Sequence, residues 1–238
     1  HQMRIGVRRL RAAIWAFSKL LRSEQTEAVK RDLKWLAGKL GPVRDLDVFL
    51  RTKVQRLANA QPPIAGFSEL ASELVYRRDL AAEAAKTAIL SSRYRFLVFN
   101  ALEWIEDGQW LRRHSAGDQR ARSYAVRWFD RRTKKAKKRL KIMRKLDDHD
   151  RHELRIAIKK LRSSVYFFES LFGASDMKLL SRYKDNLQKL QGSLGALNDI
   201  VVHQKLLTKL GASELGDRSR LISFAAGAVV GNERGEVK

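Results

Sequence analysis

The chain has 238 residues, of which 44% are hydrophobic, so it can bury a substantial core in one large domain or two small ones. Its 49 Lys and Arg residues exceed its 26 Asp and Glu residues and give a formal net charge of +23 at pH 7. The absence of cysteine excludes disulfide frameworks, thiolate nucleophiles and cysteine-bound metal centres. A positive charge of this size repels itself and favours a partner of dense negative charge, such as nucleic acid, an anionic membrane or a free polyanion.

Composition and spacing predict a helical chain. The first segment places Met3, Val7, Leu10, Ile14 and Phe17 at alternating four- and three-residue steps, which form one apolar stripe of a helix. No period-2 alternation is sustained anywhere in the chain, so strands are not expected. With breaks placed at glycines and prolines, including Gly41-Pro42 and Gln61-Pro62-Pro63, we expect helices over residues 1–22, 26–40, 42–58, 66–91, 93–107, 120–145, 150–172, 176–194, 196–210 and 217–231.

The chain also repeats itself. HQMRIGVRRLRAAIWAF at 1–17 aligns with HELRIAIKKLRSSVYFF at 152–168, which keeps the apolar stripe as Leu154, Ile158, Leu161, Val165 and Phe168. A second correspondence, in the same order, links Leu33, Leu36, Gly38, Leu40, Gly41 and Asp45 to Leu187, Leu190, Gly192, Leu194, Gly195 and Asp199. We therefore predict a single domain made of two helical repeats, residues 1–112 and 118–238, folded as two packed antiparallel bundles.

The two repeats differ at their start. A strongly basic predicted helix, residues 120–145, directly precedes His152, whereas nothing precedes His1. We therefore expect the first repeat to lack its leading helix, and a longer protein to contain residues upstream of His1.

Each repeat carries a line of cations beside its apolar stripe. Residues three, four and seven apart share a face of a helix, so each line forms one edge of the core. A solvated face needs only charge, whereas these lines repeat the same pattern of histidine and cations, which favours an anion site. The predicted anion ligands are His1, Arg4, Arg8, Arg9 and Arg11 in the first repeat, and His152, Arg155, Lys159, Lys160 and Arg162 in the second.

Aspartates and histidines are expected to support this site. Asp45 and Asp199 are each single in their repeat, so we expect them to orient an arginine by bidentate contact rather than to act in acid-base catalysis. His1 and His152 lie one turn before an arginine and would bind an anion better when protonated.

The most basic segment is residues 127–145, in which Asp130 is the only acid. Arg131, Lys134, Lys135 and Lys138 share one face of the predicted helix, and we expect this face to extend the anion groove. Lys30, which the second alignment makes equivalent to Lys184, and Lys34, one turn later, are expected to make a secondary contribution.

Residues 147–152, where His149 and His152 stand among aspartates, resemble a cluster of metal ligands. Acids at a helix start commonly cap its free N–H groups, and this interpretation is preferred. We therefore predict neither a metal nor any other cofactor.

The paired motifs together resemble the two halves of a CHAD domain, the conserved histidine α-helical domain, over essentially the whole chain. The resemblance implies two four-helix units related by pseudo-twofold symmetry around a basic groove or pore. It also implies binding of inorganic polyphosphate, association with polyphosphate granules and no catalytic activity, and we expect a cytoplasmic location. Some members of that family carry an adjacent triphosphate-tunnel (CYTH) domain, which would here lie upstream of His1. Lys159 and Lys160 depart from the arginines of the first repeat, and Asn198 replaces Arg44, so the halves are expected to contribute unequally.

Three alternatives remain open. A nucleic-acid binder would neutralise phosphates in the same way, although aromatic side chains for base stacking are few beside the stripes. A phosphotransferase would need clustered carboxylates or a phosphate-binding glycine loop, and neither pattern is found. Membrane-surface binding needs a large exposed apolar face, but the apolar stripes are expected to be buried in the bundle cores. The longest run of small and apolar residues, 224–231, is too short to span a bilayer.

Overall fold

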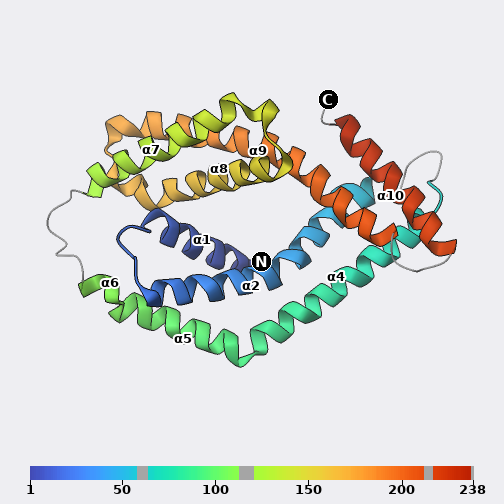
Figure 1. Cartoon of the computed structure of the whole chain (residues 1–238), viewed down its shortest axis with the longest axis horizontal. Helices are drawn as coiled ribbons and strands as arrows, with labels where there is room; N and C mark the ends of the chain where they lie inside the picture. The colour runs from blue at the N-terminus through green and yellow to red at the C-terminus, as the bar shows by residue number, and fades with distance from the viewer. Residues whose placement is uncertain (58–63, 113–120, 212–216, 237–238) are drawn as a thin grey trace. The chain divides into compact units, whose positions relative to one another are not determined.

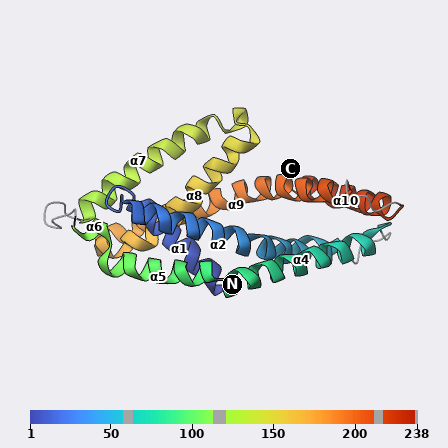
Figure 2. The same ribbon diagram turned by 60° about the horizontal axis from the view of Figure 1, so that its bottom comes forward.

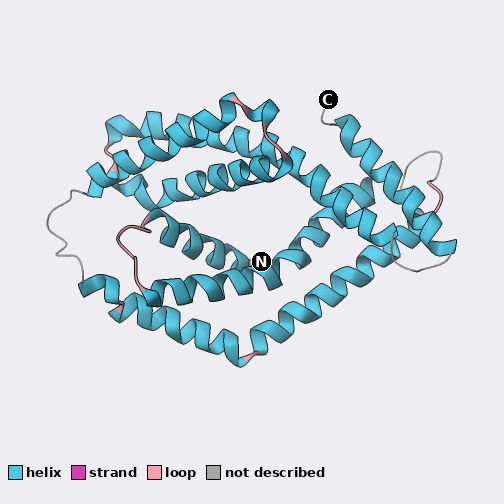
Figure 3. Ribbon diagram, in the orientation of Figure 1, coloured by secondary structure: helices cyan, strands magenta, loops and turns pink. Residues whose placement is uncertain are grey.

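The computed structural model describes residues 1–57, 64–112, 121–211 and 217–236, and every regular element within these ranges is helical (Figure 1, Figure 3). The predicted all-α fold class is therefore confirmed. None of the described helices is both long and apolar enough for a bilayer crossing. The α-helices are α1 (Gln2–Ala16), α2 (Glu24–Phe49), α3 (Gln55–Leu57), α4 (Phe67–Leu90), α5 (Ser92–Asp107), α6 (Gln109–Arg112), α7 (Ala121–Lys141), α8 (Asp148–Phe168), α9 (Ala174–Gly211) and α10 (Asp217–Glu236). Three short segments are the π-helix η1 (Leu50–Val54) and the 3₁₀-helices η2 (Met143–Lys145) and η3 (Glu169–Leu171).

The chain divides into two compact units, each assembled from separate stretches of sequence. The first, called the α8 unit below, combines Gln2–Lys34 with Phe96–Asn198. The second, called the α4 unit, combines Trp35–Arg95 with Asp199–Lys238 and His1. Helices α2, α5 and α9 contribute residues to both. The predicted internal duplication stays a prediction.

Helices α1, α7 and α8 form the centre of the α8 unit, because α8 packs against both of the others. Figure 2 shows α7 and α8 as the two arms of a hairpin. In α1, Val7 and Ile14 of the predicted stripe are buried. The predicted stripe of α8 is buried throughout, with no side chain more than 1% exposed: Leu154, Ile158, Leu161, Val165 and Phe168. The repeated apolar stripes therefore do face a core, as their spacing predicts.

An aromatic cluster joins the three helices. The ring of Phe168 lies 5.1 Å from that of Phe17, 5.5 Å from that of Trp128 and 5.4 Å from that of Phe129, between ring centroids. The hydroxyl of Tyr124 on α7 donates a hydrogen bond of 3.0 Å to the carbonyl of the last residue of α1. These contacts set the distance between α7 and the end of α1, which matters for the cations described below.

In the α4 unit, α4 contacts α10, and in both views the two helices converge at the right-hand end (Figure 1, Figure 2). Leu70 and Leu74 of α4 and Ile222 of α10 are fully buried at their contact. Gly66 caps α4 with a φ of 71°, and a Cβ there would lie 2.3 Å from the carbonyl oxygen of Leu221. Only glycine allows this conformation and this close approach of α4 to α10.

Two predicted helix breaks are wrong. Helix α2 runs through Gly41-Pro42, although an interior proline removes one backbone hydrogen bond and costs about 3 kcal/mol. Helix α9 runs through Gly195, the equivalent glycine of the second motif. Buried Leu36 and Leu46 flank Pro42, so packing on both sides holds the helix across the unfavourable residue. Helix α1 also ends at Ala16, earlier than the predicted residue 22, while Gln61-Pro62-Pro63 lies outside the described residues.

Candidate anion-binding site

The helices that carry the two predicted cation lines, α1 and α8, pack against each other. The line of the first repeat is more exposed: Arg4 is partly buried, whereas His1, Arg8, Arg9 and Arg11 are exposed. The line of α8 stands deeper, since only His152 is exposed and the other members are partly buried: Arg155, Lys159, Lys160 and Arg162.

The cations of α8 point to different neighbours. Arg162 turns toward α9, where its Nη1 donates to Oε1 of Gln191 at 3.1 Å and its Nη2 donates to Oε1 of Gln188 at 3.2 Å. Within the part of the chain that the structure describes, its Nε is buried and has no hydrogen-bond partner. Neutral amide oxygens therefore orient Arg162, and they do not neutralise its positive charge. Asp45 and Asp199 are exposed, and their orienting role stays a prediction.

Lys160 turns instead toward α1 and α7, where it meets a tryptophan and an arginine. Its Nζ lies 5.4 Å from the ring centroid of Trp15, and the guanidinium of Arg132 lies 4.6 Å from the same centroid. Trp128 meets Trp15 edge to face, with centroids 5.0 Å apart. The electron-rich faces of the indole rings thus hold two cations close together that would otherwise repel each other.

Trp15, Arg132 and Lys160 line a pocket of about 180 Å³. Its basic members are Lys160 of α8 with Arg132, Lys135 and Arg139 of α7, and its one acidic member is Glu153. Asp150 lies 3.8 Å from Arg139, a weak ion pair at the edge of the hairpin. We call these four basic residues and their pocket the hairpin pocket.

The surroundings of the hairpin pocket lower the pKa of Lys160. Burial lowers the pKa of its ammonium group, and the charges of Arg11, Arg132 and Lys30 lower it further. Glu153 acts in the opposite direction. The pocket therefore carries an excess of positive charge, which a bound anion would relieve.

A second pocket, of about 270 Å³, shares Arg132 with the first. Its lining includes Lys19 from the turn after α1, and Arg127 and Arg131 from α7. Burial raises the pKa of the Tyr124 hydroxyl in its wall, while the charges of Arg132 and Arg131 oppose that rise. Because Arg132 belongs to both pockets, the cations of α7 form one continuous basic track from Arg127 to Arg139.

Only part of the basic face predicted for α7 meets neighbouring helices. Arg131 and Lys135 line the two pockets, whereas Lys134 is exposed and pairs with Asp130 at 2.9 Å, and Lys138 is exposed.

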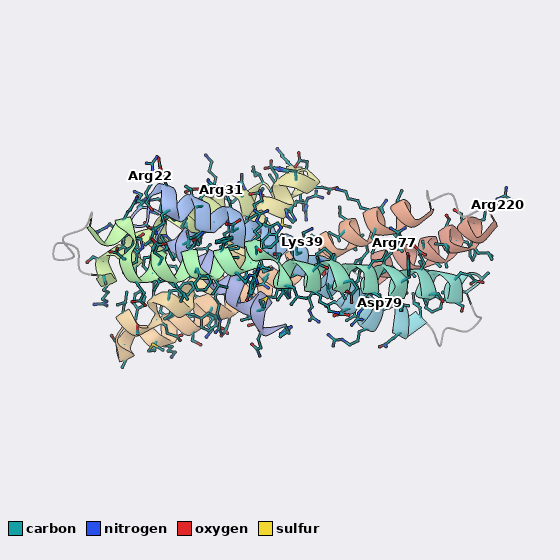
Figure 4. All side chains as sticks on the ribbon, turned by 90° about the horizontal axis from the view of Figure 1, so that it is seen from below. Arg22, Arg31, Lys39, Arg77, Asp79 and Arg220 are labelled. Atoms are coloured by element: carbon teal, nitrogen blue, oxygen red, sulfur yellow. The ribbon has the colours of Figure 1, made fainter. Side chains whose placement is uncertain are left out.

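On α2, Lys30 contributes to the field at Lys160 while pairing with Glu27 at 2.7 Å, and Lys34 is exposed. Arg22, just before α2, and Arg31, next to Lys30, are both exposed (Figure 4). They line a wide hollow of about 870 Å³ that also includes Glu24 and Glu27. Its carboxylates make this hollow less suited to an anion than the hairpin pocket.

The aspartate that precedes α8 caps the N-terminus of this helix. Asp147 is the N-cap residue, and its Oδ1 accepts a hydrogen bond of 2.7 Å from the backbone N–H of Asp150. This confirms the capping interpretation. Asp147, His149 and Asp150 could also bring ligand atoms within 4.8 Å of one another, but all three stand at the surface or only partly buried.

Comparison with known families settles where the chain belongs. The family model described as CHAD domain matches residues 1–208. The chain belongs to the CHAD family. Polyphosphate binding is the property known for CHAD domains. No curated protein matches the chain.

Two solved structures resemble this CHAD domain. The crystal structure of the CHAD domain from the plant Ricinus communis superposes with a TM-score of 0.80 and 29% identity, covering 99% of this chain and 76% of that chain. PptA from Streptomyces chartreusis gives a TM-score of 0.67 at 18% identity, covering 98% of this chain and 83% of that chain. The second likeness shows the fold alone.

Four cations that line the two pockets of this CHAD domain were not among the predicted ligands: Lys19, Arg127, Arg132 and Arg139. Their signal was present in the sequence. Arg132 follows Trp128 by four residues, and Arg139 follows Arg132 by seven, which places them beside the apolar face that Trp128 and Ala136 mark. Cations at the edge of an apolar face are the ones that packing brings near neighbouring helices.

The lowered pKa of Lys160 predicts a pH-dependent cost to stability. At neutral pH Lys160 is charged in both the folded and the unfolded chain, and the folded chain bears the full penalty of that buried charge. As pH rises from the lowered folded pKa toward the unfolded value of 10.5, the folded chain releases this proton first and the penalty disappears. In urea unfolding, Lys160→Met should therefore gain most over the parent near pH 7, and the gain should shrink as pH approaches 10. A gain independent of pH would contradict this account.

Proposed function

We propose that this CHAD domain binds inorganic polyphosphate through the cations of α1, α7 and α8, without converting it chemically. The observation that carries the proposal is the hairpin pocket, in which one carboxylate stands against four basic side chains. Arg11 and Lys30 add to the same field. Such an arrangement is unfavourable for the free protein and becomes favourable when a multivalent anion occupies it.

The shape of the basic track suits a linear polyanion. Arg127 and Arg139 lie twelve residues apart on one helix, a distance of roughly 18 Å at 1.5 Å per residue. Guanidinium and ammonium groups are presented at intervals along this distance, and phosphate oxygens can accept from each of them. A flexible phosphate chain needs neither base edges nor stacking surfaces, so cations and their spacing suffice.

The aromatic side chains near the site do not favour nucleic acid. Single-stranded nucleic acid is usually bound by stacking bases on free aromatic rings. Here Arg132 and Lys160 cover Trp15, and Nζ of Lys184 lies 4.5 Å from the ring centroid of Tyr166. Rings already stacked with cations support binding to phosphate rather than to bases.

A catalytic role is not proposed, because hydrolysis or transfer of phosphate requires a metal or an activated water beside the chain. Among the described residues that line the hairpin pocket, Glu153 alone carries a carboxylate. Purified protein incubated with polyphosphate and Mg²⁺ should release no more phosphate than buffer does. Chelator-sensitive release of phosphate would overturn this part of the proposal.

The proposal is tested by competition. At about 150 mM salt, long-chain polyphosphate should displace single-stranded RNA of equal total charge from the protein, and affinity should fall steeply as salt rises, by counterion release. Equal competition by the two polymers would indicate a general polyanion binder. In a cell, such a module would attach the protein that contains it to polyphosphate granules, and fluorescence microscopy of a tagged chain would test that location.

A further inference from the structure

Lys160 combines three features that suit a nucleophile. Its amine lines the hairpin pocket, so a small molecule in that pocket can reach it. Its ammonium group is held against the ring of Trp15, at 5.4 Å from the ring centroid. The groups facing it from each packed helix are mostly cations: Arg11 from α1, Lys30 from α2 and Arg132 from α7, with Glu153 of its own helix opposing them.

Burial and nearby positive charges both lower the pKa of Lys160, so a larger fraction of this amine is neutral than of an ordinary exposed lysine. Only the neutral amine carries the lone pair that attacks an electrophilic carbon. Lys159, the adjacent residue, does not line the pocket and so provides a natural comparison within the same helix.

The same pocket attracts phosphate. Arg132, Lys135 and Arg139 surround the space beside Lys160 and can donate to phosphate oxygens. A molecule that carries both a phosphate and a reactive acyl carbon would therefore be held with its carbonyl near the amine. Holding the two reactants together is itself a large source of rate acceleration.

We propose that Lys160 is a site of self-acylation by small acyl phosphates that bind in the hairpin pocket. The Lys160 nitrogen attacks the acyl carbon, a C–N bond forms and the bond from that carbon to the phosphate oxygen breaks. The phosphate leaves with its electron pair and takes up the proton that the amine loses, so the products are an amide and hydrogen phosphate. The reaction needs no oxidant, reductant or metal.

Acylation would regulate the proposed function, on which this part of the inference rests. The amide has no charge, so the pocket loses one of its four basic groups and holds polyphosphate less tightly. Conversely, bound polyphosphate would occupy the pocket and protect Lys160 from the acyl phosphate. The acylation state and the bound polyanion would then exclude each other.

The first experiment treats the full chain with acetyl phosphate, the smallest stable acyl phosphate, and follows each lysine by peptide mass spectrometry. Acetylation of Lys160 should exceed that of Lys159 at least several-fold, and inorganic phosphate should slow it. Equal rates at the two lysines would overturn the proposal.

Two variants separate reactivity from fold. With acetic anhydride, which carries no phosphate, Lys160 should react faster in Glu153→Gln and more slowly in Arg132→Gln, because these changes remove charges of opposite effect on its pKa. Lys159 should change little in either. Circular dichroism checks folding, and rates that do not respond in these directions would overturn the proposal.

Polyphosphate distinguishes this inference from the function on which it rests. Rapid acetylation of Lys160 that long-chain polyphosphate slows would support both. Rapid acetylation that polyphosphate leaves unchanged would support the reactive lysine and overturn the placement of polyphosphate in the pocket. Slow acetylation in a protein that binds polyphosphate would overturn the reactive lysine alone.

Discussion

Replacing Arg132, Lys135 and Lys160 together with glutamine is expected to weaken binding of long-chain polyphosphate by about 100-fold or more at about 150 mM salt. All three side chains line the hairpin pocket, and each would donate charge-assisted hydrogen bonds to phosphate oxygens. The slope of log affinity against log salt should also become shallower by about two to three, because three fewer contacts release counterions. Isothermal titration calorimetry at several salt concentrations measures both quantities.

A matched control separates the pocket from overall charge. Lys137, Lys141 and Lys145 belong to the same basic segment but are exposed and line neither pocket. Changing these three to glutamine removes the same amount of charge, yet should weaken binding only several-fold. If both triple variants lose affinity equally, the protein binds polyphosphate by its overall charge and the hairpin pocket has no special role.

The sequence predicted the buried stripes of α1 and α8 but not which cations meet neighbouring helices. The stripe of α8 and part of that of α1 are buried as their spacing predicts, because an apolar face has only one favourable destination. A cation has no such constraint, since either water or an anion can stabilise its charge. The basic segment 127–145 therefore left open which of its side chains meet other helices. In the structure Trp128 packs against Trp15, and Arg132 and Lys160 both lie over the ring of Trp15.

The partners of Arg162 illustrate the same limit. Opposite charge is the partner that a sequence suggests for an arginine. In the structure Gln188 and Gln191 accept from Arg162, from positions one turn apart on α9, while the orienting role expected of Asp45 and Asp199 stays a prediction. Neutral acceptors leave no charge signal in the sequence. Similarly, Gly41-Pro42 and Gly195 are local breaking signals, yet α2 and α9 run through them; in α2 the buried Leu36 and Leu46 lie on both sides of the proline.

The largest effect on stability is expected from Phe168→Ala. Phe168 is 1% exposed and touches Phe17, Trp128 and Phe129, so its removal leaves a cavity that three helices share. Large-to-small changes of a buried phenylalanine cost about 3–5 kcal/mol. Urea unfolding followed by tryptophan fluorescence measures this cost directly, because Trp128 reports on the same cluster.

Tyr166→Ala is the matched control, since Tyr166 lies two residues earlier on α8 and is 55% exposed. It loses mainly a contact with Lys184, and the cost should stay within about 1 kcal/mol. A cost for Phe168→Ala no larger than this would mean that the cluster does not hold α7 against α1 and α8. Because Trp128 packs on Phe168 at one end and on Trp15 at the other, the same cavity should also loosen the hairpin pocket. Folded Phe168→Ala should therefore bind polyphosphate more weakly than folded Tyr166→Ala, although neither change removes a charge.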